Sequence, residues 1–298
     1  MKKIMTFAIV LTLIVIMLGA YTRLKDAGLG CPDWPGCYGA LTVQPGTIEP
    51  EKAWIEMIHR YVAGMLGLLI FFIAFKIRSI MAFIVAGLVI FQALLGMWTV
   101  TLKLLPIVVM GHLLGGMAIL GLLTWLRASI FTSHAPPFEK KGLRIFALIG
   151  LVILMIQIAL GGWVSSNYAA LICPDVLSCQ GKLMPALDFK QAFQLFSQIG
   201  PNYQGGVLEN TARVTIQFMH RVGAIITVLY LLILSIRVFP RYKKLAIGII
   251  FTLGVQMTLG ILNIVWMLPL STAVLHNGVA ALLLMLIVTL NERLSRTL

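Results

Sequence analysis

Four of the five histidines lie in strongly apolar stretches, where an ionisable side chain is costly and indicates a function. Histidine is the commonest metal ligand in proteins. Zinc usually takes three or four protein ligands, whereas two facing imidazoles suit the axial positions of a haem iron. The alternative is a packing histidine bonded to the backbone. The four candidate ligands are His59, His112, His220 and His276.

The residues that precede two of these histidines differ in charge. Glu56 stands three residues before His59, and Gln217 stands three residues before His220, so each pair shares a helix face. Glu56 is a candidate general base, whereas Gln217 has no proton to exchange near neutral pH. The first site is predicted to perform proton-coupled chemistry and the second only to hold a cofactor. The alternative is that Glu56 lies at the outer interface, solvated and paired with Arg60.

An arginine directly follows one histidine in each half of the sequence, as Arg60 after His59 and Arg221 after His220. Because guanidinium groups bind carboxylates bidentately, both arginines can contact haem propionates. They can equally extend their charged ends to the membrane interface. Both roles stay open on the sequence alone.

The four cysteines form two pairs, each in the pattern C-P-D-x-x-x-C. We expect one disulfide within each loop, Cys31–Cys37 and Cys173–Cys179, on the oxidising side of the membrane where disulfides persist. The spacing is not C-x-x-C, which weakens a thioredoxin-like interpretation. A structural role and a redox role for the pairs both remain open.

The elements that position these residues are predicted to be membrane helices. Of the 298 residues, 60% are hydrophobic and only 11% are charged, against about 45–50% and 25% in soluble domains. This excludes a soluble globule and a disordered chain. A spanning helix takes about 20 apolar residues, and the predicted class is an all-α, polytopic membrane protein. Eight stretches are long enough: 4–22, 54–75, 79–101, 106–126, 143–165, 212–236, 245–267 and 271–290.

The net charge of +13 is predicted to report membrane orientation and some attraction to anionic lipid, and no nucleic-acid partner is expected. With the N-terminus inside, most basic residues fall in inner segments, and the long loops 23–53 and 166–211 lie outside. The first stretch is expected to be an anchor helix. Both termini are then cytoplasmic, and the four histidines lie toward the outer side. His134, in a polar inner connection, is expected to be solvated.

The two halves of the sequence are related by an internal repeat. Residues 18–37 and 160–179 match at a constant offset that pairs Gly19 with Gly161, and the histidine and cysteine positions recur in the same order. Each half starts on the same side, so the repeat is parallel, with an axis along the membrane normal. We predict two four-helix bundles side by side, residues 1–126 and 143–298, joined by a cytoplasmic linker at 127–142.

These motifs together resemble the haem A synthase family over nearly the whole chain. They are GLGCPDWPGC after the first span, EMIHR in the second, GH in the fourth, FMHR in the sixth and LHNG in the eighth. The resemblance implies oxidation of the C8 methyl of haem O to a formyl group by successive hydroxylations, giving haem A for terminal oxidases. It implies a bacterial cytoplasmic membrane protein whose partners include membrane lipid, an unidentified electron acceptor and haem O synthase.

The resemblance also implies a division of labour between the two histidine pairs. His220 and His276 would ligate a haem b cofactor in the C-terminal bundle. His59 and His112 would hold the substrate haem, with Glu56 beside it as the third catalytic residue. That division agrees with the Glu56/Gln217 difference.

Two other functions use parts of the same pattern. A cytochrome b-type carrier with paired histidine ligands, exchanging electrons with quinone, needs the histidines but not Glu56. A membrane thiol-disulfide oxidoreductase needs the cysteines but not the histidines. A transporter fits less well, because no broken helix or buried charge array is evident in the sequence.

Overall fold

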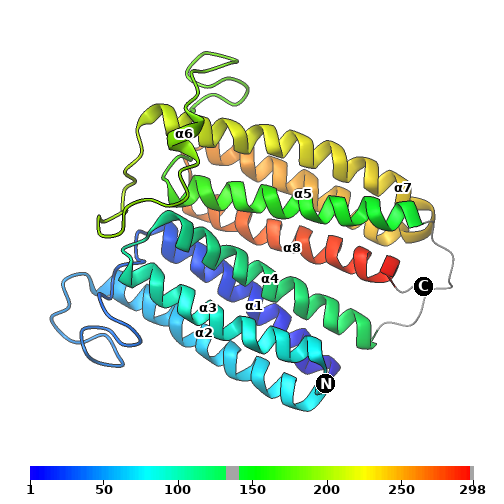
Figure 1. The fold of residues 1–298 in the computed structure, drawn as a ribbon, viewed down its shortest axis with the longest axis horizontal. Helices are drawn as coiled ribbons and strands as arrows, with labels where there is room; N and C mark the ends of the chain where they lie inside the picture. Colours follow the sequence, from blue (N-terminus) through cyan, green and yellow to red (C-terminus); the bar gives the residue numbers. More distant parts are fainter. Residues whose placement is uncertain (132–140, 296–298) are drawn as a thin grey trace.

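The computed structural model describes residues 1–131 and 141–295, and regular structure there is helical. His134 and most of the predicted linker lie outside the described residues. The helices run in chain order as α1 (Lys2–Leu24), α2 (Pro50–Ile77), α3 (Ile80–Thr101), α4 (Pro106–Phe131), α5 (Lys141–Ser166), α6 (Phe189–Ala192), α7 (Asn210–Val265) and α8 (Leu270–Ser295) (Figure 1).

Seven of these helices are long and apolar enough to cross a membrane, and α7 accounts for two of the eight predicted spans. At about 1.5 Å per residue, a straight helix of 56 residues would measure about 84 Å, far more than a bilayer. The backbone of Tyr242 is not helical, and Pro240 stands just before it. Proline removes a helical hydrogen bond and kinks a helix. Figure 1 shows the two parts of α7, yellow and orange, turning back on one another there.

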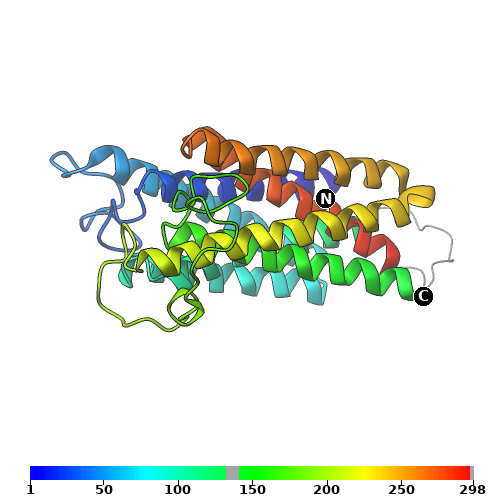
Figure 2. The same ribbon diagram turned by 90° about the horizontal axis from the view of Figure 1, so that it is seen from above.

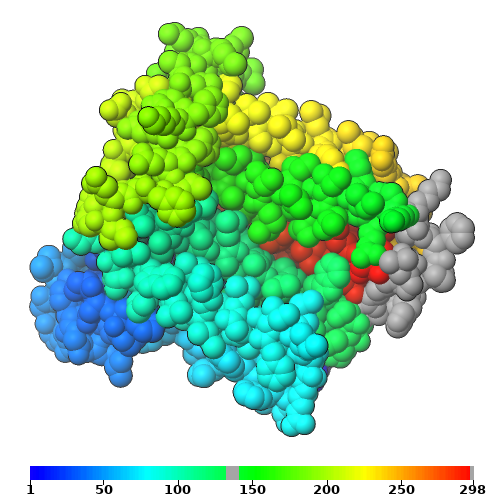
Figure 3. Space-filling model, in the orientation of Figure 1, coloured from blue at the N-terminus to red at the C-terminus, as the bar shows by residue number. Residues whose placement is uncertain are grey.

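The helices form two groups that pack side by side, as predicted. In the first group, α1 packs against α2 and α4, and α3 packs against the same two helices. In the second, α5, α7 and α8 all pack on one another. The groups meet where α1 and α4 contact α8 and where α4 contacts α5. Figures 1 and 2 show the long helices running roughly along one direction, with the long loops gathered at one end. The space-filling view in Figure 3 shows the loops of both groups at that end.

The two disulfide loops have the same local structure. Cys37 and Ala40 form a bridge, as Cys179 and Lys182 do, and the glycine inside each turn has a φ of +75°. That φ lies in the left-handed region, where glycine is favoured. Asp33 accepts hydrogen bonds from the amides of its turn, and the Gly39 amide in particular holds the pKa of Asp33 below its usual value. The likeness of the loops agrees with the predicted repeat.

Two side-chain contacts between the halves join residues that are 142 positions apart, the offset of the repeat. Arg23 donates to the carbonyl of Ser165 at 2.7 Å, and Tyr168 donates from its hydroxyl to Asp26 at 2.9 Å. The Arg23 guanidinium also lies 4.0 Å from the centre of the Tyr168 ring. In a two-fold arrangement, residues near the axis contact their own counterparts. Contacts of this kind are expected at a two-fold pseudo-axis between the loop ends of α1 and α5, which agrees with the predicted repeat.

Removing the Arg23 guanidinium should loosen the contact between the halves. We predict that Arg23→Met lowers the free energy of unfolding by about 1.5–3 kcal/mol, the range for a hydrogen bond to a charged group. Thermal unfolding in detergent, followed by circular dichroism, measures this change. The neighbouring exposed Lys25→Met is the control, with an effect within about 0.5 kcal/mol. Equal effects of the two substitutions would contradict this role of Arg23.

Candidate functional site

The structure brings the first pair of predicted ligands together inside the first helix group. The ring centroids of His59 in α2 and His112 in α4 are 6.4 Å apart, with an angle of 80° between the ring planes. Among the described helices, α2 and α4 do not pack on one another, so the two rings meet across the interior. Each lies within about three helical turns of the loop end of its helix.

The donor set and its spacing fit one metal atom between two imidazoles. A metal–imidazole bond is about 2 Å long, so rings with centroids 6.4 Å apart can bind the same atom from opposite sides. The Nδ1 atoms of His59 and His112 are buried and find no hydrogen-bond partner among the described residues. Buried polar atoms are normally satisfied. Within the described residues, three or more His, Cys, Asp or Glu side chains gather nowhere into a metal-binding group. A two-ligand iron site therefore fits better than zinc.

The second pair of histidines has additional polar neighbours. The amide nitrogen of Gln157 in α5 lies 3.0 Å from Nδ1 of His220 in α7, and that of Gln256 lies 3.2 Å from Nε2 of His276 in α8. An amide N–H donates to an unprotonated ring nitrogen, so each contact fixes the orientation of its histidine ring. In the first pair, the Gln92 amide instead donates to the backbone carbonyl of His112 at 2.7 Å. The second pair is thus held more firmly through its rings.

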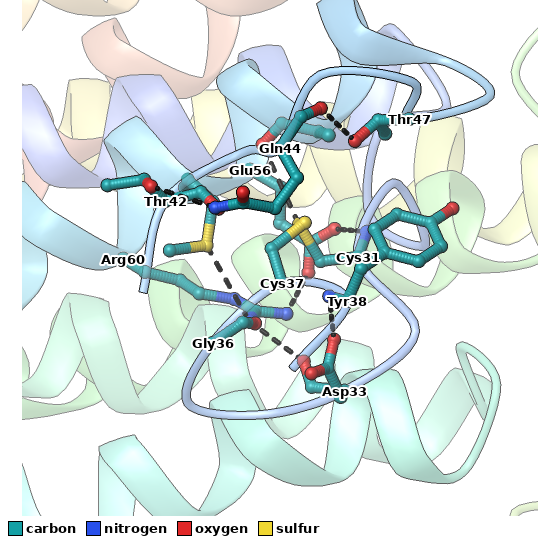
Figure 4. Close-up of a disulfide and its surroundings, with 12 residues drawn as sticks. Cys31, Asp33, Gly36, Cys37, Tyr38, Thr42, Gln44, Thr47, Glu56 and Arg60 are labelled. Atoms are coloured by element: carbon teal, nitrogen blue, oxygen red, sulfur yellow. Dashed lines mark hydrogen bonds and ion pairs between the residues drawn. A yellow bond between two sulfur atoms is a disulfide. The ribbon is translucent and has the colours of Figure 1, made fainter. Parts of the chain in front are cut away.

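Glu56 is buried, with 4% of its surface exposed, and it is fully engaged. Its carboxylate accepts from the backbone N–H of Cys31 at 2.8 Å and pairs closely with Arg60 (Figure 4). The alternative expectation was a Glu56 that is solvated and paired with Arg60. The pairing is present, but the carboxylate is buried and not solvated. Gln217 is buried as well, and its side-chain oxygen has no partner among the described residues. Only the first site therefore holds a buried carboxylate one helical turn from a candidate ligand.

Arg60 and Arg221, which each follow a histidine, donate hydrogen bonds to backbone carbonyls of the disulfide loops. Arg60 donates to the carbonyls of Asp33 at 2.9 Å and Gly36 at 2.6 Å. Arg221 donates to the carbonyls of Cys173 and Ser178, both at 2.7 Å. These contacts match neither of the two roles that the sequence left open. Contact with haem propionates stays a prediction.

Both predicted disulfides, Cys31–Cys37 and Cys173–Cys179, are present, and their cysteines are almost completely buried. Thiol–disulfide exchange needs direct access of an attacking thiolate to a sulfur atom. The burial of all four sulfur-bearing residues, together with the arginines that hold the loops, favours a structural role.

Sequence reasoning missed the residues that surround the histidine rings. Gln157 contacts the ring of His220, and nothing in the sequence distinguishes it from a glutamine that bonds between helices. Each histidine ring also lies against a glycine of another helical segment. The sequence does single out those glycines, because they recur at matching positions of the two halves. It does not show that they contact the histidines, because a sequence does not reveal which helices are neighbours.

The fold and these sites define a class: a multi-pass helical membrane protein with paired histidines in its interior. The model of the COX15-CtaA family, described as cytochrome oxidase assembly protein, matches residues 2–288. This chain belongs to that family.

Several proteins similar to this chain carry the name heme A synthase. The one from Shewanella oneidensis is 48% identical, over 97% of this chain and 94% of its own length. The one from Ehrlichia ruminantium is 28% identical, over 91% of this chain and 86% of its own. The one from Alkalihalophilus pseudofirmus is 27% identical, over 78% of this chain and 74% of its own.

Each disulfide loop should depend on its own arginine. We predict that Arg60→Lys speeds amide exchange in residues 31–40 about ten-fold or more and leaves residues 173–182 unchanged, because an ammonium cannot reproduce the forked contacts of a guanidinium. Arg221→Lys should give the reverse pattern. Hydrogen–deuterium exchange with mass spectrometry measures both loops in one sample, so each variant is the control for the other. Protection unchanged in both loops would refute this role.

Proposed function

We propose that this protein is a haem A synthase, an oxidoreductase that converts the C8 methyl group of haem O to a formyl group. The observation that carries the proposal is the His59–His112 pair, 6.4 Å apart across the interior, with the buried carboxylate of Glu56 one turn away. The 48% identity to a heme A synthase over almost the whole chain supports it.

The two pairs of histidines would hold two haems. His59 and His112 would bind the iron of the substrate haem O, and His220 and His276 that of a haem b cofactor. When bound, a haem supplies the redox chemistry. The ring contacts of Gln157 and Gln256 orient both histidines of the second pair, which supports that pair as the resident site. The first pair lacks them and suits a haem that must enter and leave.

With water as the source of the oxygen atom, the net change R–CH3 + H2O → R–CHO releases four electrons and four protons, two of the protons from the methyl group and two from the water. The chain must therefore exclude bulk water, orient the methyl edge and accept protons nearby. Glu56 has one oxygen on the Cys31 amide and the other on Arg60. Since each carboxylate oxygen carries two lone pairs, Glu56 can still accept a proton or orient a water molecule. The electrons pass to an acceptor that is still to be identified.

The proposed location is the bacterial cytoplasmic membrane, with both termini inside and the histidine sites toward the outer side. The basic residues of the inner connections support this orientation. Haem O synthase, which makes the substrate, is a proposed partner. The thiol-disulfide oxidoreductase alternative is disfavoured by the burial of both disulfides.

Replacing Glu56 by an uncharged residue distinguishes a haem A synthase, which needs Glu56, from a simple electron carrier, which does not. We predict that Glu56→Gln lowers haem A formation at least about 100-fold, the lower range for loss of a general acid or base. Mass spectrometry of haems extracted from the purified protein, made in cells that supply haem O, measures the product. Glu51→Gln, an exposed carboxylate in the first turn of the same helix, is the control with full product. Wild-type protein that contains only haem b despite a supply of haem O would refute the proposal.

The division between the two sites makes a second prediction. His220→Ala or His276→Ala should remove haem b from the purified protein, because each leaves a single axial ligand. His59→Ala should keep haem b and lose haem O and haem A. The same extraction and mass identification measures all three variants. Loss of haem b in His59→Ala alone would reverse the assignment.

A further inference from the structure

Each of the four histidine rings rests against a glycine of a neighbouring helical segment. A Cβ atom placed on these glycines would lie between 3.1 and 3.3 Å from the Cε1 atom of the histidine ring. This is closer than the 3.5–4.0 Å of a favourable carbon–carbon contact. The pairs are Gly19 with His59, Gly96 with His112, Gly161 with His220 and Gly260 with His276.

Close helix packing, the common role of glycine in membrane helices, does not account for these four contacts. A Cβ atom on Gly260 would have only atoms of the His276 ring within 4 Å, among the described residues outside the glycine's own stretch of helix. At Gly19 the three nearest atoms all belong to the His59 ring. By contrast, Gly150 lies against leucine and tyrosine side chains, and Gly278 lies against a methionine. The four contacts are thus specific to the imidazoles.

We infer that Gly19, Gly96, Gly161 and Gly260 are positioning residues that set where each axial ligand stands. This rests on the proposed function in one respect only, that the histidines bind haem iron. The contact is made at Cε1, the ring carbon between the two nitrogens, so the glycine fixes the ring whichever nitrogen binds the iron. A glycine can do this because it has no Cβ atom, so an imidazole edge can approach its backbone without crowding.

A histidine bound to iron cannot move away from an added methyl group without disturbing its bond to the metal. A free side chain could yield by a few tenths of an ångström, but His59 and His112 face one another at 6.4 Å and would share one iron. A displaced ring therefore tilts or lengthens its bond to the metal. Gly96→Ala should act on the first site, and Gly260→Ala should act on the second.

The chain offers matched controls on the same helices. Gly87 lies with Gly96 on α3, and Gly254 lies with Gly260 on α7. A Cβ on either control glycine would meet nothing within 4 Å in the described structure. Full-length wild type and the four alanine variants are purified with their bound haems. Low-temperature electron paramagnetic resonance resolves the ferric signals, and His112→Ala and His276→Ala assign each signal to its site. Haem content per protein and thermal unfolding are measured on the same samples.

We expect Gly96→Ala to shift or weaken the first-site signal and to lower haem occupancy there about ten-fold, as other changes around ligands do. The second-site signal stays unchanged. Gly260→Ala gives the reverse, and both controls match wild type. Unchanged signals in Gly96→Ala and Gly260→Ala would overturn the inference, as would equal loss of both signals, which indicates general unfolding. A wild type that holds two haems but makes no haem A would refute the proposed enzyme and leave this inference standing.

Discussion

The cost of an unpaired polar group inside a membrane governs how the interior of this protein is built. Few polar side chains occur in its spanning helices, and most of those that do have a specific partner. Glu56 meets both a backbone amide and Arg60, and Gln157 meets a histidine ring. The Nδ1 atoms of His59, His112 and His276 are among the buried polar atoms that find no partner in the described residues. At a histidine pair such as His59 and His112, a metal bound between the rings would supply the missing partner.

The same constraint explains why the two sites can differ although the halves are alike. The loops share their turn geometry, their disulfide and their supporting arginine. The difference lies in single side chains close to the histidines. Glu56 adds a charge to the first site, where Gln217 leaves the second neutral. Under the proposed function, this one difference separates chemistry on a substrate at the first site from binding of a cofactor at the second.

The sequence predicted the helical class, the eight spans and the two cysteine pairs, because apolar length and repeated motifs are local properties. The order of the spans predicted that the four histidines lie toward the same side of the membrane, two in each bundle. The structure shows that His59 and His112 face one another. It did not predict that Arg60 and Arg221 hold the loops, since the backbone carbonyls that they contact come from turns whose shape appears only on folding. The spans predicted at 212–236 and 245–267 are the two parts of α7, on either side of the non-helical Tyr242.

Because Arg60 follows His59 and Arg221 follows His220, each disulfide loop is coupled through its arginine to one histidine of a pair. Two neighbouring residues on a rigid helix move together, so any displacement of a loop is transmitted to the ring beneath it. His112 and His276 have no such attachment next to them in the sequence. Each pair of histidines thus consists of one residue coupled to a disulfide loop and one held by the central helices α4 or α8, each of which packs against four other helices.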